Sequence, residues 1–288
     1  MVNRLIINEM LALKKMPAVF LSILFFVNVA SIAEVHSKSL VIKVGVVPQF
    51  EQRQMFRNWH PILIELEKIT GLKFELVGSP KIPVFEKQFT KGAYDLAYMN
   101  PYHVLKAYES QGYLPLVRDS TKLKGVLVVD KNSPIKSVKE LKNKVIAFPS
   151  PNALGASLLM RSILIEKFKL GFQSKYVQTH SSVYLHVVKK LVDAGGGVDR
   201  TLNRQSDFLQ KSLRVIYKTP AIVPHPIVVH PRLSPSQRRL IKGGLLKLFK
   251  TERGKKLFKN IPVNTLVSTS INDYKSLGKY NLDKYFEK

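Results

Sequence analysis

Residues 94–103 read YDLAYMNPYH, and this stretch decides the fold class. Its apolar middle suits a short buried strand, and the Asn100-Pro101 pair suits the start of a helix, because asparagine caps the first turn and proline fits the first helical position. The neighbouring segments repeat the alternation: a strand at 41–47 (VIKVGVV), a helix at 59–69 (WHPILIELEKI), a strand at 74–77 and a helix around 85–89. This order predicts a parallel, doubly wound α/β sheet.

A second α/β cycle follows the polar turn at 130–134 (DKNSP). Its predicted elements are a helix opening at Ser137, a strand at 145–148, helices at 158–168 and 183–192, a strand at 176–179, a turn at the glycines 194–197, and strands at 198–202 and 215–217. The Pro-rich segment 220–226 (PAIVPHP) then leads to a last strand and Lys-rich helices. We predict that 130–134 and 220–226 are crossings between two lobes and act as hinges.

The predicted architecture is therefore two Rossmann-like α/β lobes with mixed, mostly parallel sheets joined by a two-crossing hinge. Lobe 1 comprises residues 34–129 plus 222–288, and lobe 2 comprises residues 130–221.

The N-terminus has the outline of a cleaved signal peptide. Residues 1–15 carry three basic side chains and one acidic one, residues 17–30 (PAVFLSILFFVNVA) carry no charge, and residues 31–33 (SIA) supply small residues for cleavage. The apolar run is roughly 21 Å long as a helix, which is short for a hydrocarbon core of about 30 Å. We predict that residues 1–33 direct secretion into the periplasm, with an uncleaved anchor as the alternative.

Charge and cysteine content narrow the function. The chain has 288 residues, 46 lysines and arginines against 20 acidic residues, and no cysteine. The lack of cysteine excludes disulfides, thiolate nucleophiles, cysteine-ligated zinc, iron–sulfur clusters and a lipoprotein anchor. A net charge of +26 attracts small anions and anionic surfaces, and nucleic acid only nonspecifically, since no nucleic-acid-binding motif accompanies it.

Candidate binding residues lie where predicted strands lead into helices. Ligands of open α/β sheets bind at the carboxyl ends of the strands, where helix N-termini present free N–H groups to an anion. The first junction contains Tyr98 and Asn100, and an ordinary helix start is its alternative interpretation. The second is residues 148–157 (FPSPNALGAS), where Ser150, Asn152 and a backbone of small residues suit an oxyanion; a plain loop and helix cap is the alternative.

The third junction combines residues 179–182 (THSS) with 195–201 (GGGVDRT). The triple glycine lacks the lysine of a phosphate-binding loop, so we interpret it as a helix end and turn. Arg200 is the informative residue, because a fixed guanidinium grips a carboxylate or phosphonate with two hydrogen bonds; a solvated arginine is the alternative.

Metal and catalytic motifs are lacking in the sequence. The spacing of the seven histidines, with His225 and His230 five residues apart, does not make a metal site. No GxSxG, HExxH or paired-carboxylate motif occurs, so we expect neither an enzyme nor a cofactor.

Taken together, the motifs resemble the periplasmic substrate-binding proteins of phosphate/phosphite/phosphonate-type ABC transporters. The resemblance covers roughly residues 41–258. It rests on five segments: 44–48 (VGVVP), 94–103, 148–152 (FPSPN), 197–203 (GVDRTLN), and 219–226, which contains the motifs TP and PHP. It implies a type II two-lobe fold that closes on its ligand, with the anion on helix N-termini of the second lobe. The residues that it assigns to the ligand are Tyr98, Asn100, Ser150, Asn152, the backbone of Ala153, Gly155 and Ala156, His180 and Arg200.

The chain departs from this family in two respects. Phosphonate binders carry a hydroxyl-rich run where this chain has Ala153-Leu154-Gly155, and Arg200 stands beside Asp199, near which they place a carboxylate for an amino group. The resemblance therefore implies a purely anionic ligand without an amine.

The function implied is that of a monomeric secreted protein that delivers a phosphonate- or phosphate-like oxyanion to the membrane permease of an ABC importer. A periplasmic input for a membrane sensor kinase is the first alternative. An enzyme using Tyr98, His180 and Asp199 and a basic surface-association protein are two others.

Overall fold

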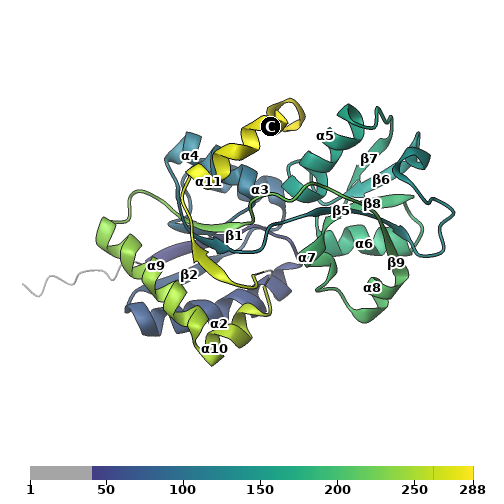
Figure 1. The fold of residues 1–288 in the computed structure, drawn as a ribbon. Coiled ribbons are helices and arrows are strands. Elements are labelled where there is room, and N and C mark those ends of the chain that lie inside the picture. Colours follow the sequence, from purple (N-terminus) through teal and green to yellow (C-terminus); the bar gives the residue numbers. More distant parts are fainter. Residues whose placement is uncertain (1–40, 262, 288) are drawn as a thin grey trace, which may run out of the picture. The chain divides into compact units, whose positions relative to one another are not determined.

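The computed structural model describes residues 41–261 and 263–287, which lie in one unit of the chain, Leu40–Lys288. The predicted leader, residues 1–33, lies outside the described residues. The strands form two mixed sheets with helices around them (Figure 1). None of the helices described is long and apolar enough to cross a membrane.

The first sheet has the order β11-β4-β10-β3-β1-β2. Its strands are β1 (Val41–Val46), β2 (Lys73–Val77), β3 (Leu96–Tyr98), β4 (Leu114–Asp119), β10 (Pro226–Val229) and β11 (Leu266–Ser268). β1 pairs in parallel with β2 and β3, and Val44 lies opposite both Leu76 and Leu96. β10 inserts antiparallel between β3 and β4, so a strand from late in the chain completes the sheet begun by the N-terminal part.

The helices of the first sheet come from both ends of the described chain. They are α2 (Gln52–Thr70), α3 (Ile82–Thr90), α4 (Pro101–Gln111), α9 (Pro235–Lys250), α10 (Glu252–Phe258), α11 (Asn272–Lys275), η4 (Ser276–Tyr280) and η5 (Leu282–Tyr285). α9 and α10 pack against α2 (Figure 1). A Cβ on Gly244 of α9 would lie 2.6 Å from the Thr70 side chain, so glycine permits this close approach.

The second sheet has the order β7-β6-β8-β5-β9. Its strands are β5 (Gly125–Asp130), β6 (Val145–Phe148), β7 (Gln173–Tyr176), β8 (Ala194–Val198) and β9 (Leu213–Lys218), and its helices are η2 (Val138–Leu141), η3 (Leu154–Leu158), α5 (Leu159–Glu166), α6 (His180–Val188), α7 (Asp199–Leu202) and α8 (Asp207–Ser212). Alternate residues of β5 bury against opposite layers. Leu127 packs in one core cluster with Met160 of α5, and Val128 in another with Tyr184 of α6.

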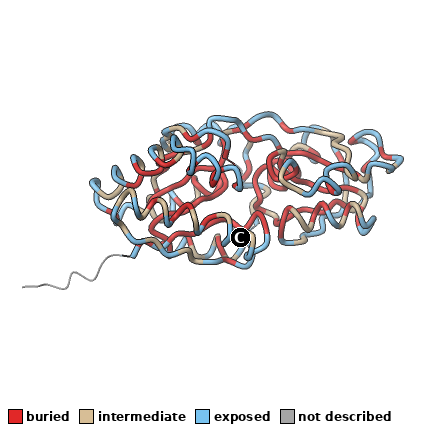
Figure 2. Tube along the Cα trace, turned by 90° about the horizontal axis from the view of Figure 1, so that it is seen from below, coloured by how far each residue is buried: buried red, intermediate tan, exposed pale blue. Residues whose placement is uncertain are grey.

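Buried residues run through the interior of the described protein (Figure 2), and the glycines of β8 are among the buried residues. The predicted turn at 194–197 and strand at 198–202 are wrong: the glycines form the centre of β8, and residues 199–202 form α7. Packing explains the difference. A Cβ on Gly196 would lie 2.1 Å from the Ala156 carbonyl oxygen, and a Cβ on Gly197 2.1 Å from the Tyr184 hydroxyl. Glycine occupies these positions because neighbouring groups lie too close to the strand to leave room for a Cβ, and not because the chain turns there.

The chain crosses between the sheets twice. β5 pairs with β8 and β9, although the boundary at 129/130 assigned it to lobe 1. The first crossing is therefore at 120–124, whereas 130–134 is a surface turn at the end of β5, and polar turn chemistry by itself did not distinguish the two. The second crossing, between β9 and β10, coincides with 220–226. The two crossings pair with each other, since Leu123 and Ile222 exchange two backbone hydrogen bonds of 2.9 Å.

Candidate anion-binding site

A small cavity lies where the carboxyl ends of the parallel strands of the two sheets meet. Its first wall consists of Val47, Gln49, Ile82, Asn100 and His225, and its second wall of Ala153, Leu154, Gly155, Ala156, His180 and Val198. The first wall belongs to loops and helix starts of the first sheet, and the second to those of the second sheet. This is the place at which open α/β sheets bind ligands.

The two walls touch each other and leave a cavity of about 10 Å³. The Asn100 side-chain amide donates a 3.1 Å hydrogen bond to the Asn152 carbonyl, and the His180 N–H donates one of 3.3 Å to the Gln49 carbonyl. A single water molecule needs about 10 to 15 Å³, so a ligand can enter only when the walls move apart.

Asn100 is fully occupied within the protein. Its side-chain oxygen accepts from the N–H groups of Tyr102 and His103, at 2.9 and 2.8 Å, and therefore caps α4. Its amide nitrogen also lies 2.9 Å from His103 Nε2. The sequence prediction of a cap is confirmed, and the cap consumes the free N–H groups that an anion would need at this junction.

The junction after β6 has the opposite character. Ala153 precedes η3 and offers no side-chain cap, and η3 continues directly into α5. Within the described ranges, the backbone N–H groups of Leu154, Gly155 and Ala156 have no acceptor. Three uncapped donors at a helix N-terminus carry partial positive charge and face a cavity, which is the arrangement that binds an anion.

Two buried histidines border this row of donors. His180 Nδ1 lies 3.2 Å from the Thr201 hydroxyl, and burial lowers the pKa of His180 to about 3. His225 Nε2 lies 3.3 Å from the Gln49 side-chain nitrogen, and burial, followed by the charge of Arg200, holds the pKa of His225 well below its usual value. Both rings are therefore neutral at pH 7, and the cavity contains no formal charge of its own.

The structure brings five of the nine predicted ligand residues to the cavity: Asn100, Ala153, Gly155, Ala156 and His180. Tyr98 lies behind the first wall, with its ring 5.4 Å from that of His225, and burial raises its pKa. The Ser150 hydroxyl is buried and has no partner in the described part of the protein. The Asn152 side chain instead holds the C-terminal segment, donating to the Glu287 carbonyl at 2.6 Å and accepting from its N–H at 2.9 Å.

Arg200 has a different set of partners from those expected. Its Nη1 lies 2.7 Å from an Asp119 carboxylate oxygen, and its Nη2 donates to the Thr121 carbonyl. Both residues of this ion pair are buried, and Asp119 also accepts a 2.6 Å hydrogen bond from the Asn264 N–H. Arg200 therefore ties α7 to the first crossing, and this geometry does not support the predicted grip on a ligand.

Sequence reasoning missed six wall residues: Val47, Gln49, Ile82, Leu154, Val198 and His225. His225 was considered as a metal ligand and as part of the PHP segment of the family resemblance, but not as a ligand-binding residue. The signal that could have found it is its place in the Pro-rich crossing, directly before β10. No group of three metal-ligating side chains occurs in the described residues.

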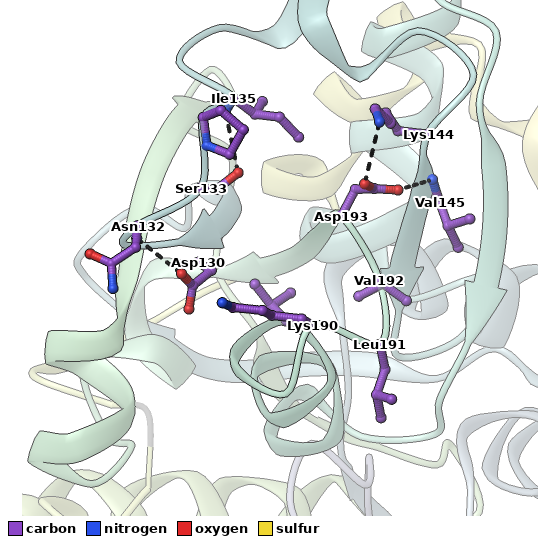
Figure 3. A pocket seen from close by; sticks show the side chains of 12 residues that line it. Asp130, Asn132, Ser133, Ile135, Lys144, Val145, Lys190, Leu191, Val192 and Asp193 are labelled. Atoms are coloured by element: carbon purple, nitrogen blue, oxygen red, sulfur yellow. Dashed lines mark hydrogen bonds and ion pairs between the residues drawn. The ribbon is translucent and has the colours of Figure 1, made fainter.

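A larger cavity of about 380 Å³ lies elsewhere on the second sheet (Figure 3). It is lined by residues 130, 132–135, 144–145, 187 and 190–193, at the amino ends of β6 and β8. There Asp193 accepts a 2.9 Å hydrogen bond from the Val145 N–H and lies 3.7 Å from Lys144. The location is opposite to the one at which such sheets bind ligands, so size does not identify the site.

Comparison with known proteins identifies the family of the chain. Residues 44–274 match the family described as ABC transporter, phosphonate, periplasmic substrate-binding protein. The chain is 23% identical over 257 residues to the phosphonates-binding periplasmic protein of Escherichia coli K12, covering 84% of this chain and 76% of that protein.

Experimental structures share the fold. A binding-protein component of a Pseudomonas aeruginosa ABC phosphonate transporter superposes with a TM-score of 0.78 at 17% identity, covering 85% of this chain and 87% of that one. A Prochlorococcus marinus protein in complex with methylphosphonate superposes with a TM-score of 0.76 at 18% identity, covering 85% and 98%. The chain belongs to the family of periplasmic substrate-binding proteins of phosphonate ABC transporters.

Proposed function

We propose that this protein captures a small phosphonate-type oxyanion between its two sheets and delivers it to the membrane permease of an ABC importer. The observation that carries the proposal is the row of unpaired N–H groups at Leu154, Gly155 and Ala156, which faces the cavity between the two walls. These backbone donors take the place of the hydroxyl side chains that this chain lacks. The apolar side chains of Val47, Ile82 and Leu154 suit the carbon-bonded side of an alkylphosphonate.

Capture is a shift between an open and a closed state. The hydrogen bonds from Asn100 to Asn152 and from His180 to Gln49 join the two walls, and a ligand touching both walls favours the state in which these contacts exist. The paired crossings at Leu123 and Ile222 are the place where the backbone bends. The protein acts as a monomer, and the importer family supports a permease over a sensor kinase as its partner.

The side chains favour binding over catalysis. Burial raises the pKa of Tyr98 and lowers that of His180 to about 3, so neither exchanges a proton readily at neutral pH. Asp199, the third candidate for an enzyme, accepts a 2.8 Å hydrogen bond from the Arg200 N–H at the start of α7.

The test gives the N–H groups of residues 154–156 a hydrogen-bond acceptor that belongs to the protein itself. Ala153 has the extended backbone of a helix cap, so Ala153→Asp and Ala153→Asn place an acceptor on the free donors. We expect both variants to raise the free energy of unfolding by about 1 kcal/mol, the value of a helix cap, and to abolish methylphosphonate binding in calorimetry.

The matched control is Glu51→Asp, which offers a cap to the uncapped start of α2 outside the cavity without changing the charge. It should leave binding unchanged. The proposal is wrong if the wild-type protein binds none of methylphosphonate, phosphite and phosphate, or if Ala153→Asn binds methylphosphonate as tightly as the wild type.

A further inference from the structure

A buried arginine contacts both ends of the segment that carries the free N–H groups. We refer to this segment, residues 151–157, as the binding junction. Arg161 lies on α5 and is only 8% exposed to solvent. Its Nε donates a 3.2 Å hydrogen bond to the Ser157 hydroxyl, and its Nη2 donates one of 3.0 Å to the Pro151 carbonyl. The free N–H groups at 154–156 lie between these two contacts in the sequence.

The other partners of Arg161 come from the segment 285–287, at the end of η5 and directly after it. Its Nη2 also donates to the Tyr285 carbonyl at 2.8 Å, and its Nη1 lies 3.2 Å from a Glu287 carboxylate oxygen. A buried guanidinium is costly unless a carboxylate pairs with it and its other donors find acceptors. Glu287 and the neutral acceptors meet these conditions, and the four hydrogen bonds fix the position of the planar group.

The segment 285–287 is held in turn by a helix of the first sheet. Directly before it, the Asp283 carboxylate accepts a 2.6 Å hydrogen bond from the Tyr102 hydroxyl and lies 2.8 Å from Lys106 Nζ. The ring of Phe286 lies 5.6 Å from that of Tyr102. Both Tyr102 and Lys106 belong to α4, the helix that Asn100 caps. The contacts of Arg161 therefore link the binding junction to a helix that starts at the first wall.

Backbone N–H groups bind an anion tightly only when they already have the orientation that the anion requires. If they are ordered at the moment of binding, the cost of ordering is subtracted from the affinity. Ala153 supplies no side-chain cap that would order the helix start from within. Arg161 can supply this order through Pro151 and Ser157, and it does so from outside the cavity, because it is not one of the wall residues.

We propose that Arg161 is a positioning residue of the anion site: it holds both ends of the binding junction, and Glu287 and the Tyr285 carbonyl hold Arg161. This proposal rests on the function proposed above. Arg161 acts on the ligand only through the N–H groups of residues 154–156. An arginine that served stability alone would leave the affinity of the folded protein unchanged, and one that acted through its charge alone could be replaced by lysine.

The first arm of the test measures methylphosphonate affinity by calorimetry, at a temperature at which each variant is folded. Arg161→Met removes the four hydrogen bonds, and we expect it to weaken binding about ten- to a hundredfold. Arg161→Lys keeps the charge but not the planar set of donors, so it should bind nearly as weakly. Lys167→Met, at the exposed position directly after α5, makes the same charge change and should bind as wild type does.

The second arm uses variants that disturb the fold least, and it decides the question if Arg161→Met does not fold. Ser157→Ala removes one acceptor of Arg161, and Glu287→Gln removes the charge of its partly exposed partner. Each should weaken binding about three- to tenfold. In the Arg161→Lys background, Ser157→Ala should have much less effect, because the hydroxyl acts through the guanidinium. Equal effects of Ser157→Ala in the two backgrounds would contradict the proposal.

The third arm measures backbone order by nuclear magnetic resonance without any ligand. The amide order parameters of residues 154–156 should fall from about 0.85 towards about 0.6 in Arg161→Met. Those of Tyr102 and His103, which Asn100 holds, should stay the same. Unchanged order at 154–156 would show that Arg161 does not position these groups, even if the variant has a lower melting temperature.

The outcomes separate the two proposals. If wild type binds methylphosphonate and Arg161→Met binds it as tightly, or if Arg161→Lys retains wild-type affinity, the positioning role is wrong and the proposed function stands. If wild type binds none of methylphosphonate, phosphite and phosphate, the proposed function is wrong and the role of Arg161 falls with it.

Discussion

The junctions after β3 and after β6 have similar sequences and opposite chemistry. Asn100-Pro101 opens α4 with a side-chain cap, whereas Ser150-Pro151-Asn152 leads into η3 with no cap. In the first, the Asn100 oxygen satisfies two N–H groups; in the second, three N–H groups have no acceptor in the described chain. Each junction supplies one wall of the same cavity.

The difference shows how a helix start becomes a structural part or a binding site. An asparagine that caps its own helix leaves nothing for a ligand, but it can hold the facing wall, as Asn100 does through the Asn152 carbonyl. The start of α6 follows the structural pattern, since the Thr179 hydroxyl accepts from the Ser182 N–H. Of these three starts, only the one at Ala153 lacks a side-chain cap.

The largest effect should come from Gly196→Ala, which pushes the binding junction away from β8. The added Cβ would lie 2.1 Å from the Ala156 carbonyl oxygen and 2.5 Å from the Phe148 ring. We expect a loss of about 3 kcal/mol in the free energy of unfolding, measured by urea denaturation, and loss of anion binding. Gly243→Ala on α9 is the control, because its Cβ meets nothing within 4 Å and should stabilise slightly. A cost below about 1 kcal/mol for Gly196→Ala would refute this close approach.

The next largest effect is the loss of stability at acidic pH that His180 causes. Burial favours the neutral ring in the folded protein, with a pKa of about 3, whereas the unfolded chain takes up a proton below a pH of about 6.5. Stability from this residue is present above that pH and is lost as the pH falls towards 3. We expect a loss of about 2 kcal/mol between pH 6.5 and 5.

His180→Gln should remove this part of the pH dependence in urea denaturation curves. His60→Gln, at an exposed position of α2, should leave it unchanged. An acid sensitivity that is equal in His180→Gln and wild type would show that the His180 ring is not held neutral.

The smallest effect should come from Asn100→Ala, which makes the first junction resemble the second. Two N–H groups lose their cap and the bond to the facing wall is broken, so we expect a cost of about 1 to 2 kcal/mol in thermal or urea denaturation. Asn132→Ala in the exposed turn after β5 should cost much less. Equal costs would mean that Asn100 does not serve as a cap.

Much of the fold follows from local patterns in the sequence. The β-branched run at β1 and the Asn100 cap are properties of neighbouring residues, and the structure contains both of them. β8 could not be predicted in this way. Its glycines are required by the close approach of Ala156 and Tyr184, which are distant in sequence. The sequence prediction placed the first crossing after β5 instead of before it. The apolar sequence of this strand does not indicate which of the two sheets it joins.

The candidate site also contains features that local sequence predicts and features that it does not. The sequence shows no capping side chain at the helix start after β6, and the free N–H groups at 154–156 follow from that. The role of Arg200 depends on Asp119, a residue 81 positions earlier that only the tertiary fold brings within 2.7 Å. Pairing of that kind has no local signal, so the sequence indicated Arg200 as a ligand residue although the fold pairs it with Asp119.

The most direct measurement is a titration of the isotopically labelled protein with methylphosphonate, followed by the backbone amide resonances. Hydrogen bonding to the anion should shift the amide protons of Leu154, Gly155 and Ala156 strongly downfield. Those of Tyr102 and His103, which Asn100 already holds, should move little. If the ligand binds while the amides at 154–156 stay in place, or if those at 102 and 103 take the larger shift, the uncapped junction is not the anion site.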